Sequence, residues 1–75
     1  MPRAPRMTAD EALRALHRDG WHVARQTGSH QQLTHPVKPG TVTVPTYRNV
    51  TLSQKTLSSI ARQSGLTVDA LKDLS

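Results

Sequence analysis

The chain has 75 residues, which suffices for one small domain and is too short for two hydrophobic cores. Ten Lys and Arg residues against five Asp and Glu residues give a formal net charge of +5, which favours a polyanionic partner such as nucleic acid over a surface charged only for solubility. The lack of cysteine excludes disulfides and thiolate zinc sites, and no apolar run approaches the roughly 20 residues that cross a bilayer, so we expect a cytoplasmic protein without a membrane segment.

Residues 1–7 (MPRAPRM) combine two prolines with two arginines and have no apolar period, which is typical of a disordered basic leader. We expect a single domain over residues 8–75. Thr8 and Glu11 match a capping box, which predicts a helix from about Ala9 to Asp19. The apolar stripe of this helix consists of Ala9, Ala12, Leu13 and Leu16.

Gly20 is placed to end this helix, and the apolar period then changes from 3.6 to two, which indicates a strand. One row of the strand consists of Trp21, Val23 and Arg25, and the other of His22, Ala24 and Gln26. Because Trp21 and Val23 are large and apolar, their row should pack on a helix, which leaves His22 and Gln26 on the opposite face.

A Gly-Ser pair separates this strand from the next one. Gly28 can adopt the positive φ that a tight reversal needs, and Ser29 can hydrogen-bond the local backbone. The second strand is expected over about His30 to His35, with Leu33 toward the core. The opposite face then carries His30, Gln32 and Thr34.

The rest of the chain predicts one more strand and two helices. Residues 41–45 (TVTVP) alternate like a half-buried strand and stop at a proline, before a loop over residues 46–51. Ser53 is placed to cap a helix over about Gln54 to Gln63, and a short helix over about Val68 to Leu74 follows behind the cap Thr67. The predicted fold is therefore α+β, in two layers, with one sheet face covered by helices and the other open.

Several side chains could bind a phosphate backbone. The candidates are Arg25, Ser29, Lys38, Arg48, Ser53, Lys55 and Arg62. Lys55 lies in the first turn of the helix that Ser53 caps, where unpaired backbone N–H groups and the helix dipole already favour an anion. The alternative interpretation of Lys55 and Arg62 is an ordinary solvated helix face.

The four histidines raise the question of a metal site. There is no cysteine and no helical His-x-x-x-His pair, and His30 and His35 are five apart on a strand and should face opposite ways. We therefore expect neither a metal nor a small-molecule cofactor. His30 is distinct because the preceding turn displays it and because imidazole can both give and take a proton near neutral pH. The alternative is an ordinary surface histidine.

Six short motifs occur in a characteristic order: Gly20-Trp21, Gly28-Ser29-His30, His35-Pro36, Val42-Thr43-Val44-Pro45, Thr56-Leu57 with Ile60, and Gln63-Ser64-Gly65-Leu66-Thr67. In order and spacing they resemble the HicA toxin family over about Thr8 to Leu74. The resemblance implies a fold like that of double-stranded-RNA-binding domains, mRNA cleavage by a toxin, a HicB-like antitoxin partner, and His30 as the catalytic residue. Three positions depart from the family pattern: Tyr47 replaces a frequent histidine, Lys55 a glycine and Leu33 an aromatic residue.

Our hypothesis is a metal-independent endoribonuclease in which His30 transfers a proton and basic side chains hold the RNA. Because RNA supplies its own nucleophile, the 2′-hydroxyl, cleavage needs only positioning, proton transfer and charge stabilisation. The candidate stabilisers of charge are Lys55, Arg25 and Arg48, and the candidates for a second proton-transfer group are His35, Tyr47 or water. Two other classes stay open, namely a non-catalytic RNA-binding module and an interaction protein that docks an acidic partner.

Overall fold

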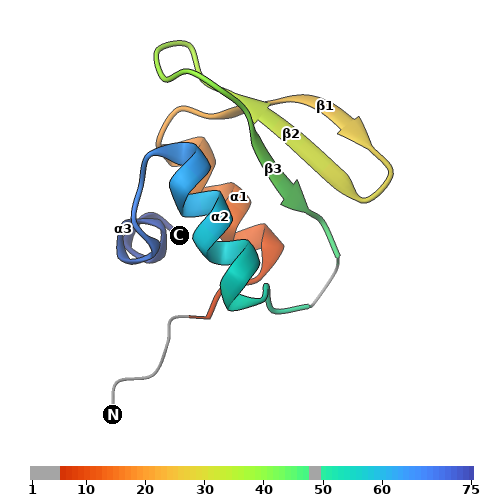
Figure 1. The fold of residues 1–75 in the computed structure, drawn as a ribbon, viewed down its shortest axis with the longest axis vertical. Helices are drawn as coiled ribbons and strands as arrows, with labels where there is room; N and C mark the ends of the chain where they lie inside the picture. Colours follow the sequence, from red (N-terminus) through yellow and green to blue (C-terminus); the bar gives the residue numbers. More distant parts are fainter. Residues whose placement is uncertain (1–5, 48–49) are drawn as a thin grey trace.

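The computed structural model describes residues 6–47 and 50–75 (Figure 1). In chain order the elements are α1 (Ala9–Arg18), β1 (His22–Thr27), β2 (His30–Thr34), β3 (Val42–Pro45), α2 (Gln54–Ser64) and α3 (Val68–Leu74). The strands form one antiparallel sheet in the order β1-β2-β3, and α1 and α2 cover one side of it, with α3 packed against α1. The predicted α+β fold, with the order α-β-β-β-α and a short C-terminal helix, is confirmed.

Side-chain caps set where the helices begin. The Thr8 backbone N–H donates to Glu11 Oε1 at 3.0 Å and the Glu11 N–H donates to Thr8 Oγ1 at 3.2 Å, so the predicted capping box is present. Ser53 Oγ accepts from the Thr56 N–H at 3.1 Å at the start of α2, and Thr67 caps α3 in the same way. All three helices therefore start where the sequence predicts.

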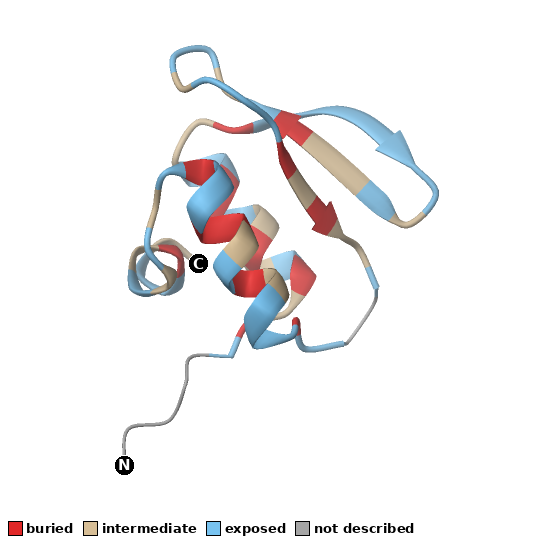
Figure 2. Ribbon diagram, viewed as in Figure 1, coloured by how far each residue is buried: buried red, intermediate tan, exposed pale blue. Residues whose placement is uncertain are grey.

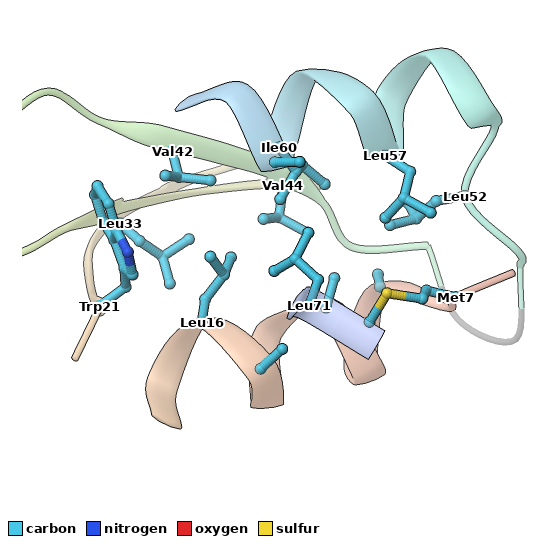
Figure 3. Packing of buried hydrophobic residues seen from close by; sticks show 14 residues of the cluster. Met7, Leu16, Trp21, Leu33, Val42, Val44, Leu52, Leu57, Ile60 and Leu71 are labelled. Atoms are coloured by element: carbon cyan, nitrogen blue, oxygen red, sulfur yellow. The ribbon is translucent and has the colours of Figure 1, made fainter. Parts of the chain in front are cut away.

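The hydrophobic core lies between the sheet and the helices (Figure 3). Its largest fully buried side chains are Trp21, Met7, Leu16, Leu33, Leu57, Ile60, Leu71, Val42 and Val44. Leu52 and Leu57 are both buried at the start of α2, on either side of its cap, as a hydrophobic staple requires. The predicted inward position of Leu33 is confirmed.

Met7 corrects the predicted boundary of the basic leader. Its side chain is only 1% exposed and packs in the core near Leu52, and the Leu52 N–H donates to the Met7 carbonyl at 2.8 Å. One methionine after a Pro/Arg-rich segment has no periodicity that could reveal its burial. The packed domain thus includes Met7, and residues 1–5 of the predicted leader lie outside the described residues.

The exposure of β1 contradicts the expected packing of that strand. Trp21 is buried as predicted, but every residue of β1 is exposed, and Val23 is 41% exposed (Figure 2). β1 is an edge strand, whereas the helices pack against β3 at the other edge of the sheet. The prediction that Val23 packs on a helix is therefore wrong, because the β1–β2 hairpin extends past the helical layer (Figure 1).

An irregularity in β1 also changes which side chains share a face. Val23 pairs with Leu33 and Arg25 pairs with Gln32, so Ala24 is an extra residue, a β-bulge. Residues that pair directly across antiparallel strands lie on the same face. Val23 therefore lies on the helix side with Leu33, whereas Arg25 lies on the opposite side with Gln32.

The same bulge places Gln26 on the helix side of the sheet instead of the opposite side. Gln26 pairs with Gln31, and the Gln31 amide donates to Gln26 Oε1 at 3.5 Å, so both lie on the helix side of the sheet. The prediction that Gln26 shares a face with His22 is therefore wrong. A strict two-residue period cannot anticipate an extra residue in one strand.

Candidate active site

A two-residue turn displays His30. Thr27 pairs with His30, so only Gly28 and Ser29 lie in the loop between β1 and β2. Gly28 has φ +57°, in the left-handed region that L side chains rarely adopt, and this conformation suits the twist of a tight hairpin. His30 is consequently the first residue of β2, at the end of the hairpin.

The turn is anchored to the end of β3. The Ser29 carbonyl accepts two hydrogen bonds from Thr46, one from the backbone N–H at 2.6 Å and one from Oγ1 at 2.9 Å. His30 pairs with Pro45, the last residue of β3. Because Pro45 has no N–H, Thr46 provides the donors that close this end of the sheet. The Gly-Ser-His and Val-Pro motifs thus meet in space and hold the His30 backbone in place.

The His30 side chain is exposed and makes no hydrogen bond or ring contact with another residue that the structure describes. Tyr47, which follows Thr46 and is 53% exposed, lies just beyond the segment that anchors the turn. A fixed backbone with an accessible imidazole is the arrangement that a proton-transfer group needs before substrate binds.

His30 belongs to a polar sheet face that no helix covers, which we call the open sheet face (Figure 1). The register of the three strands places eight residues on it: His22, Arg25, Thr27, His30, Gln32, Thr34, Thr43 and Pro45. Each of them is exposed or half-buried. These eight described residues therefore offer hydroxyl, amide, imidazole and guanidinium groups and include no carboxylate.

The acidic residues of the chain are segregated from this face. All five lie in or directly after α1 or in α3: Asp10, Glu11, Asp19, Asp69 and Asp73. Residues 20–68, which contain the whole sheet and α2, include five Lys and Arg residues and no acid. This distribution can be read from the sequence, but a net charge alone does not reveal it. It makes the sheet and α2 complementary to an anionic ligand.

The predicted phosphate-binding cations divide into separate groups. Arg25 is exposed on the open sheet face, whereas Lys55 and Arg62 are exposed at the first and last turns of α2, in the helical layer on the other side of the sheet. The structure therefore does not bring Lys55 or Arg62 onto the face that carries His30. Arg48 lies outside the described residues.

The two serines among the predicted ligands both contribute to the fold, Ser53 through its hydroxyl and Ser29 through its backbone carbonyl. Ser53 Oγ accepts from the Thr56 N–H and donates to Thr56 Oγ1 at 2.9 Å, so its hydroxyl caps α2. Ser29 contributes its carbonyl to the anchor described above, and the residue is half-buried.

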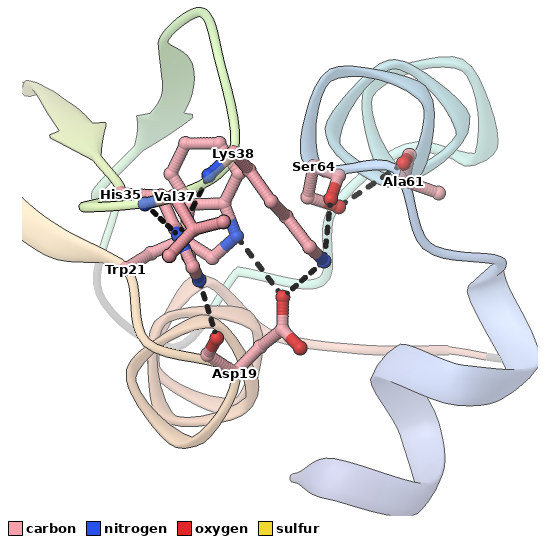
Figure 4. A network of polar contacts seen from close by, with 7 residues as sticks. All are labelled: Asp19, Trp21, His35, Val37, Lys38, Ala61 and Ser64. Atoms are coloured by element: carbon pink, nitrogen blue, oxygen red, sulfur yellow. Dashed lines mark hydrogen bonds and ion pairs between the residues drawn. The ribbon is translucent and has the colours of Figure 1, made fainter.

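Lys38 has its ammonium group in a polar network between the ends of α1 and α2 (Figure 4). Lys38 Nζ pairs with the Asp19 carboxylate and donates to the Ser64 carbonyl at 3.1 Å. The latter contact places a cation at the C-terminal end of α2, where the helix dipole favours it. Beside this network is an open pocket of about 340 Å³, lined by Lys38, Pro39, Arg62, Gln63, Ser64 and Gly65.

His35 is fully engaged in the same network. Its Nδ1 accepts from the backbone N–H groups of Val37 and Lys38, each at 3.0 Å, so Nδ1 carries no proton. Its Nε2 therefore carries the proton and donates to the Asp19 carbonyl at 2.8 Å. The ring also contacts Trp21 edge to face, with 5.2 Å between the ring centroids. These contacts give His35 a structural role, and they leave neither ring nitrogen free for a substrate.

Among residues 6–47 and 50–75, no three His, Asp or Glu side chains gather where they could hold a metal ion. Within the same described residues no helix has both the length and the apolar character to span a membrane.

Comparisons with known proteins give one assignment. No curated protein matches the chain. A family model, described as the HicA toxin of bacterial toxin-antitoxin systems, matches residues 9–66, which run from the start of α1 to just beyond the end of α2. That segment contains the Gly-Ser-His turn, the Val-Pro end of β3 that anchors it, and the network around His35. The chain belongs to the HicA toxin family.

Proposed function

We propose that this chain is an mRNA interferase toxin, a metal-independent endoribonuclease in which His30 transfers the proton. The observation that carries the proposal is the position of His30. It is exposed, its backbone is fixed by the bonds between Ser29 and Thr46, and it lies on a polar face without carboxylates. Membership of the HicA toxin family supports the same reaction class.

The reaction needs little chemistry from the protein. The RNA 2′-hydroxyl attacks the adjacent phosphorus, the bond from phosphorus to the 5′-oxygen breaks, and the products are a 2′,3′-cyclic phosphate and a 5′-hydroxyl. A base removes the proton from the 2′-hydroxyl and an acid protonates the leaving 5′-oxygen. Proton transfer of this kind contributes typically about 10²–10⁴-fold to a rate, so loss of His30 should be readily measurable.

One imidazole cannot be base and acid at the same moment, so a second group completes the pair. Both ring nitrogens of His35 are bonded to backbone atoms, which argues against His35 in this role. Tyr47 is exposed and follows the residue that bonds to Ser29. We therefore favour the Tyr47 hydroxyl or a water molecule as the second group.

The RNA would be held by the acid-free part of the chain. Arg25 shares the open sheet face with His30 and is therefore a candidate for a phosphate near the reacting one. Lys55 and Arg62 on α2, with Ser53 at its start, are candidates for more distant phosphates. Ser29 and Arg48 complete the proposed set, whereas Lys38, also predicted from the sequence, pairs with Asp19 and could contact RNA only after releasing it.

The partner proposed from the family is a HicB-like antitoxin protein. Such a partner would neutralise the toxin if it covered His30 and the open sheet face together, because RNA could not then reach the imidazole. Protection of a long RNA by a stoichiometric complex supports this arrangement. A complex that leaves His30 exposed and cleaves at the rate of the free chain would contradict it.

The decisive test is cleavage of a long RNA in EDTA by the wild-type chain, His30→Ala and His17→Ala, all purified identically. His17→Ala is a matched control because His17 is also an exposed histidine but lies on α1, away from the open sheet face. We expect the wild type and His17→Ala to cut, His30→Ala to lose at least about 10²-fold in rate, and the ends to be cyclic phosphates and 5′-hydroxyls. Equal cutting by His30→Ala, or normal cutting of a substrate with a 2′-deoxy group at the cleaved position, would overturn the mechanism.

A non-catalytic RNA-binding module is the second candidate, and the acid-free sheet and α2 favour it equally. It predicts that wild type and His30→Ala bind RNA with the same affinity and that neither cuts. An interaction protein for an acidic partner predicts instead weak RNA binding with little salt dependence, the reverse of counterion release.

A further inference from the structure

We propose that the cleaved RNA lies across the open sheet face as a single strand, and that Arg25 binds the phosphate next to the one that reacts at His30. This inference rests on the proposed ribonuclease function and adds the path of the substrate and the residue that fixes its register. The β-bulge at Ala24 is the structural feature that makes it possible.

The bulge decides on which side of the sheet Arg25 lies. If β1 paired regularly beyond Val23, Ala24 would lie opposite Gln32, and Arg25 would lie opposite Gln31 on the helix side. With the bulge, Arg25 itself lies opposite Gln32, on the open sheet face. Bulges occur beside active sites because they redirect a side chain in this way.

Arg25 is then a diagonal neighbour of His30. Thr27 lies directly opposite His30, and Arg25 precedes Thr27 by two residues on the same face of β1. Such diagonal pairs are separated by about 7–8 Å, which long side chains can bridge. A guanidinium at this distance can bind one phosphate while the imidazole acts at its neighbour.

The charges around Arg25 leave its guanidinium available to an anion. Arg25 is exposed and forms no ion pair with any carboxylate in the described part of the chain. The acidic residues all lie in or beside α1 and in α3, outside residues 20–68. This differs from Lys38, whose ammonium is neutralised by Asp19.

The form of the open sheet face favours a single strand as its occupant. Gln32 lies between Arg25 on β1 and Thr43 on β3, so amide and hydroxyl groups follow one another across the sheet. They can hydrogen-bond to 2′-hydroxyls and to base edges, which an unpaired strand exposes. Cleavage also requires the 2′-hydroxyl, the phosphorus and the 5′-oxygen to align, and a regular duplex resists that alignment.

The test measures binding of a short single-stranded RNA at several salt concentrations, with His30→Ala as the uncleaving parent. Arg25→Gln should weaken binding about tenfold and reduce the steepness of the salt dependence by about 0.7, as expected for one lost phosphate contact. Lys55→Gln removes the same charge from α2 and should have a smaller effect. A duplex of the same sequence should bind more weakly than the single strand.

A double variant, Arg25→Gln with Gln26→Arg, separates position from charge. It keeps the net charge but moves the cation to the helix side, because Gln26 pairs with Gln31. We expect it to bind as weakly as Arg25→Gln alone. Recovery of the parent affinity would overturn the inference, since Arg25 would then act only through long-range attraction.

The outcomes also separate this inference from the proposed function. Suppose that the wild type cuts RNA and that Arg25→Gln binds and cuts as well as its parent, or that the duplex binds as tightly as the single strand. The proposed RNA path is then wrong, and the proposed ribonuclease function is unaffected. If the wild type does not cut and the parent does not bind RNA, both fail together.

Discussion

The His35 ring packs closely against Gly20, and this contact gives the Gly-Trp and His-Pro motifs a structural role. A Cβ atom on Gly20 would lie 2.7 Å from His35 Nε2, and Gly20 has φ +104°, a conformation that L side chains rarely adopt. Only glycine allows the ring to approach the Asp19 carbonyl and to contact Trp21. The Gly-Trp and His-Pro motifs therefore stabilise the fold where α1 meets the loop after β2.

Replacing His35 should consequently reduce the stability of the fold, whereas replacing His30 should hardly change it. His35→Ala leaves the Asp19 carbonyl and two backbone N–H groups without their partner, so we expect the free energy of unfolding to fall by about 1–3 kcal/mol. His30→Ala removes an exposed side chain and should change it by less than about 0.5 kcal/mol. Urea unfolding measures both.

The rate of RNA cleavage per folded molecule should respond to the two variants in the opposite way from stability. We expect it to be retained in His35→Ala and lost in His30→Ala. If His35→Ala were as stable as the wild type but inactive, His35 would be the second proton-transfer group after all, and its structural role would be wrong.

The two histidines also show what sequence reasoning can reach at the scale of a residue. His30 is predictable because its setting is local: a glycine that allows the turn, a serine, and the start of a strand. The role of His35 depends on a carbonyl 16 residues earlier in the chain and on an aromatic ring of another segment. No local pattern contains that information.

At the scale of elements, the caps and the order of the antiparallel strands were predictable, whereas the register and exposure of β1 were not. Capping hydrogen bonds join residues three apart, so Thr8, Ser53 and Thr67 could be identified from the sequence. The bulge at Ala24 and the exposure of β1 depend on how far the hairpin extends beyond the helices. The sequence therefore predicts Arg25 as a candidate ligand but not the face on which it lies.

The capping box of α1 should make stability depend on pH. The hydrogen bond from the Thr8 N–H, opposed by desolvation and assisted by the Thr8 hydroxyl and by Lys72 and Arg14, lowers the pKa of Glu11 below its ordinary value of 4.5. A carboxyl group with a lowered pKa in the folded state stabilises the fold above that ordinary value, and the contribution is lost as the pH falls through the lowered pKa.

Glu11→Gln tests this dependence. We expect the variant to be less stable than the wild type by about 0.5 kcal/mol at pH 7, because a charged acceptor becomes a neutral one in a half-buried capping box. The difference should shrink as the pH falls below 4.5. Chemical denaturation of both chains at neutral and acidic pH measures it, and a difference that stays constant or grows in acid would contradict the proposed cause.

At the scale of the whole molecule, charge and packing divide the chain into two regions. The acidic residues lie on α1, its end and α3, and the sheet and α2 have none. Lys38 joins the regions, since its ammonium contacts Asp19 after α1 and the Ser64 carbonyl at the end of α2. In the described structure, Lys38 is the one cation of the acid-free region that pairs with a carboxylate, and its role is therefore structural. Arg25 has no such partner there and can bind a ligand.

Lys38→Met tests this division of roles. Removing the ammonium leaves the half-buried Asp19 carboxylate with only the hydrogen bond from Trp21 Nε1–H and removes the Lys38 donor from the Ser64 carbonyl, so we expect a loss of about 1–2 kcal/mol in the free energy of unfolding. RNA affinity, measured in the His30→Ala background, should change little, and the salt dependence should keep its steepness because no phosphate contact is lost. Arg25→Gln should show the opposite result, with a less steep salt dependence and unchanged stability. If Lys38→Met also reduced the salt dependence, Lys38 would exchange Asp19 for a phosphate when RNA binds, and the substrate would extend from the open sheet face to the pocket beside Arg62.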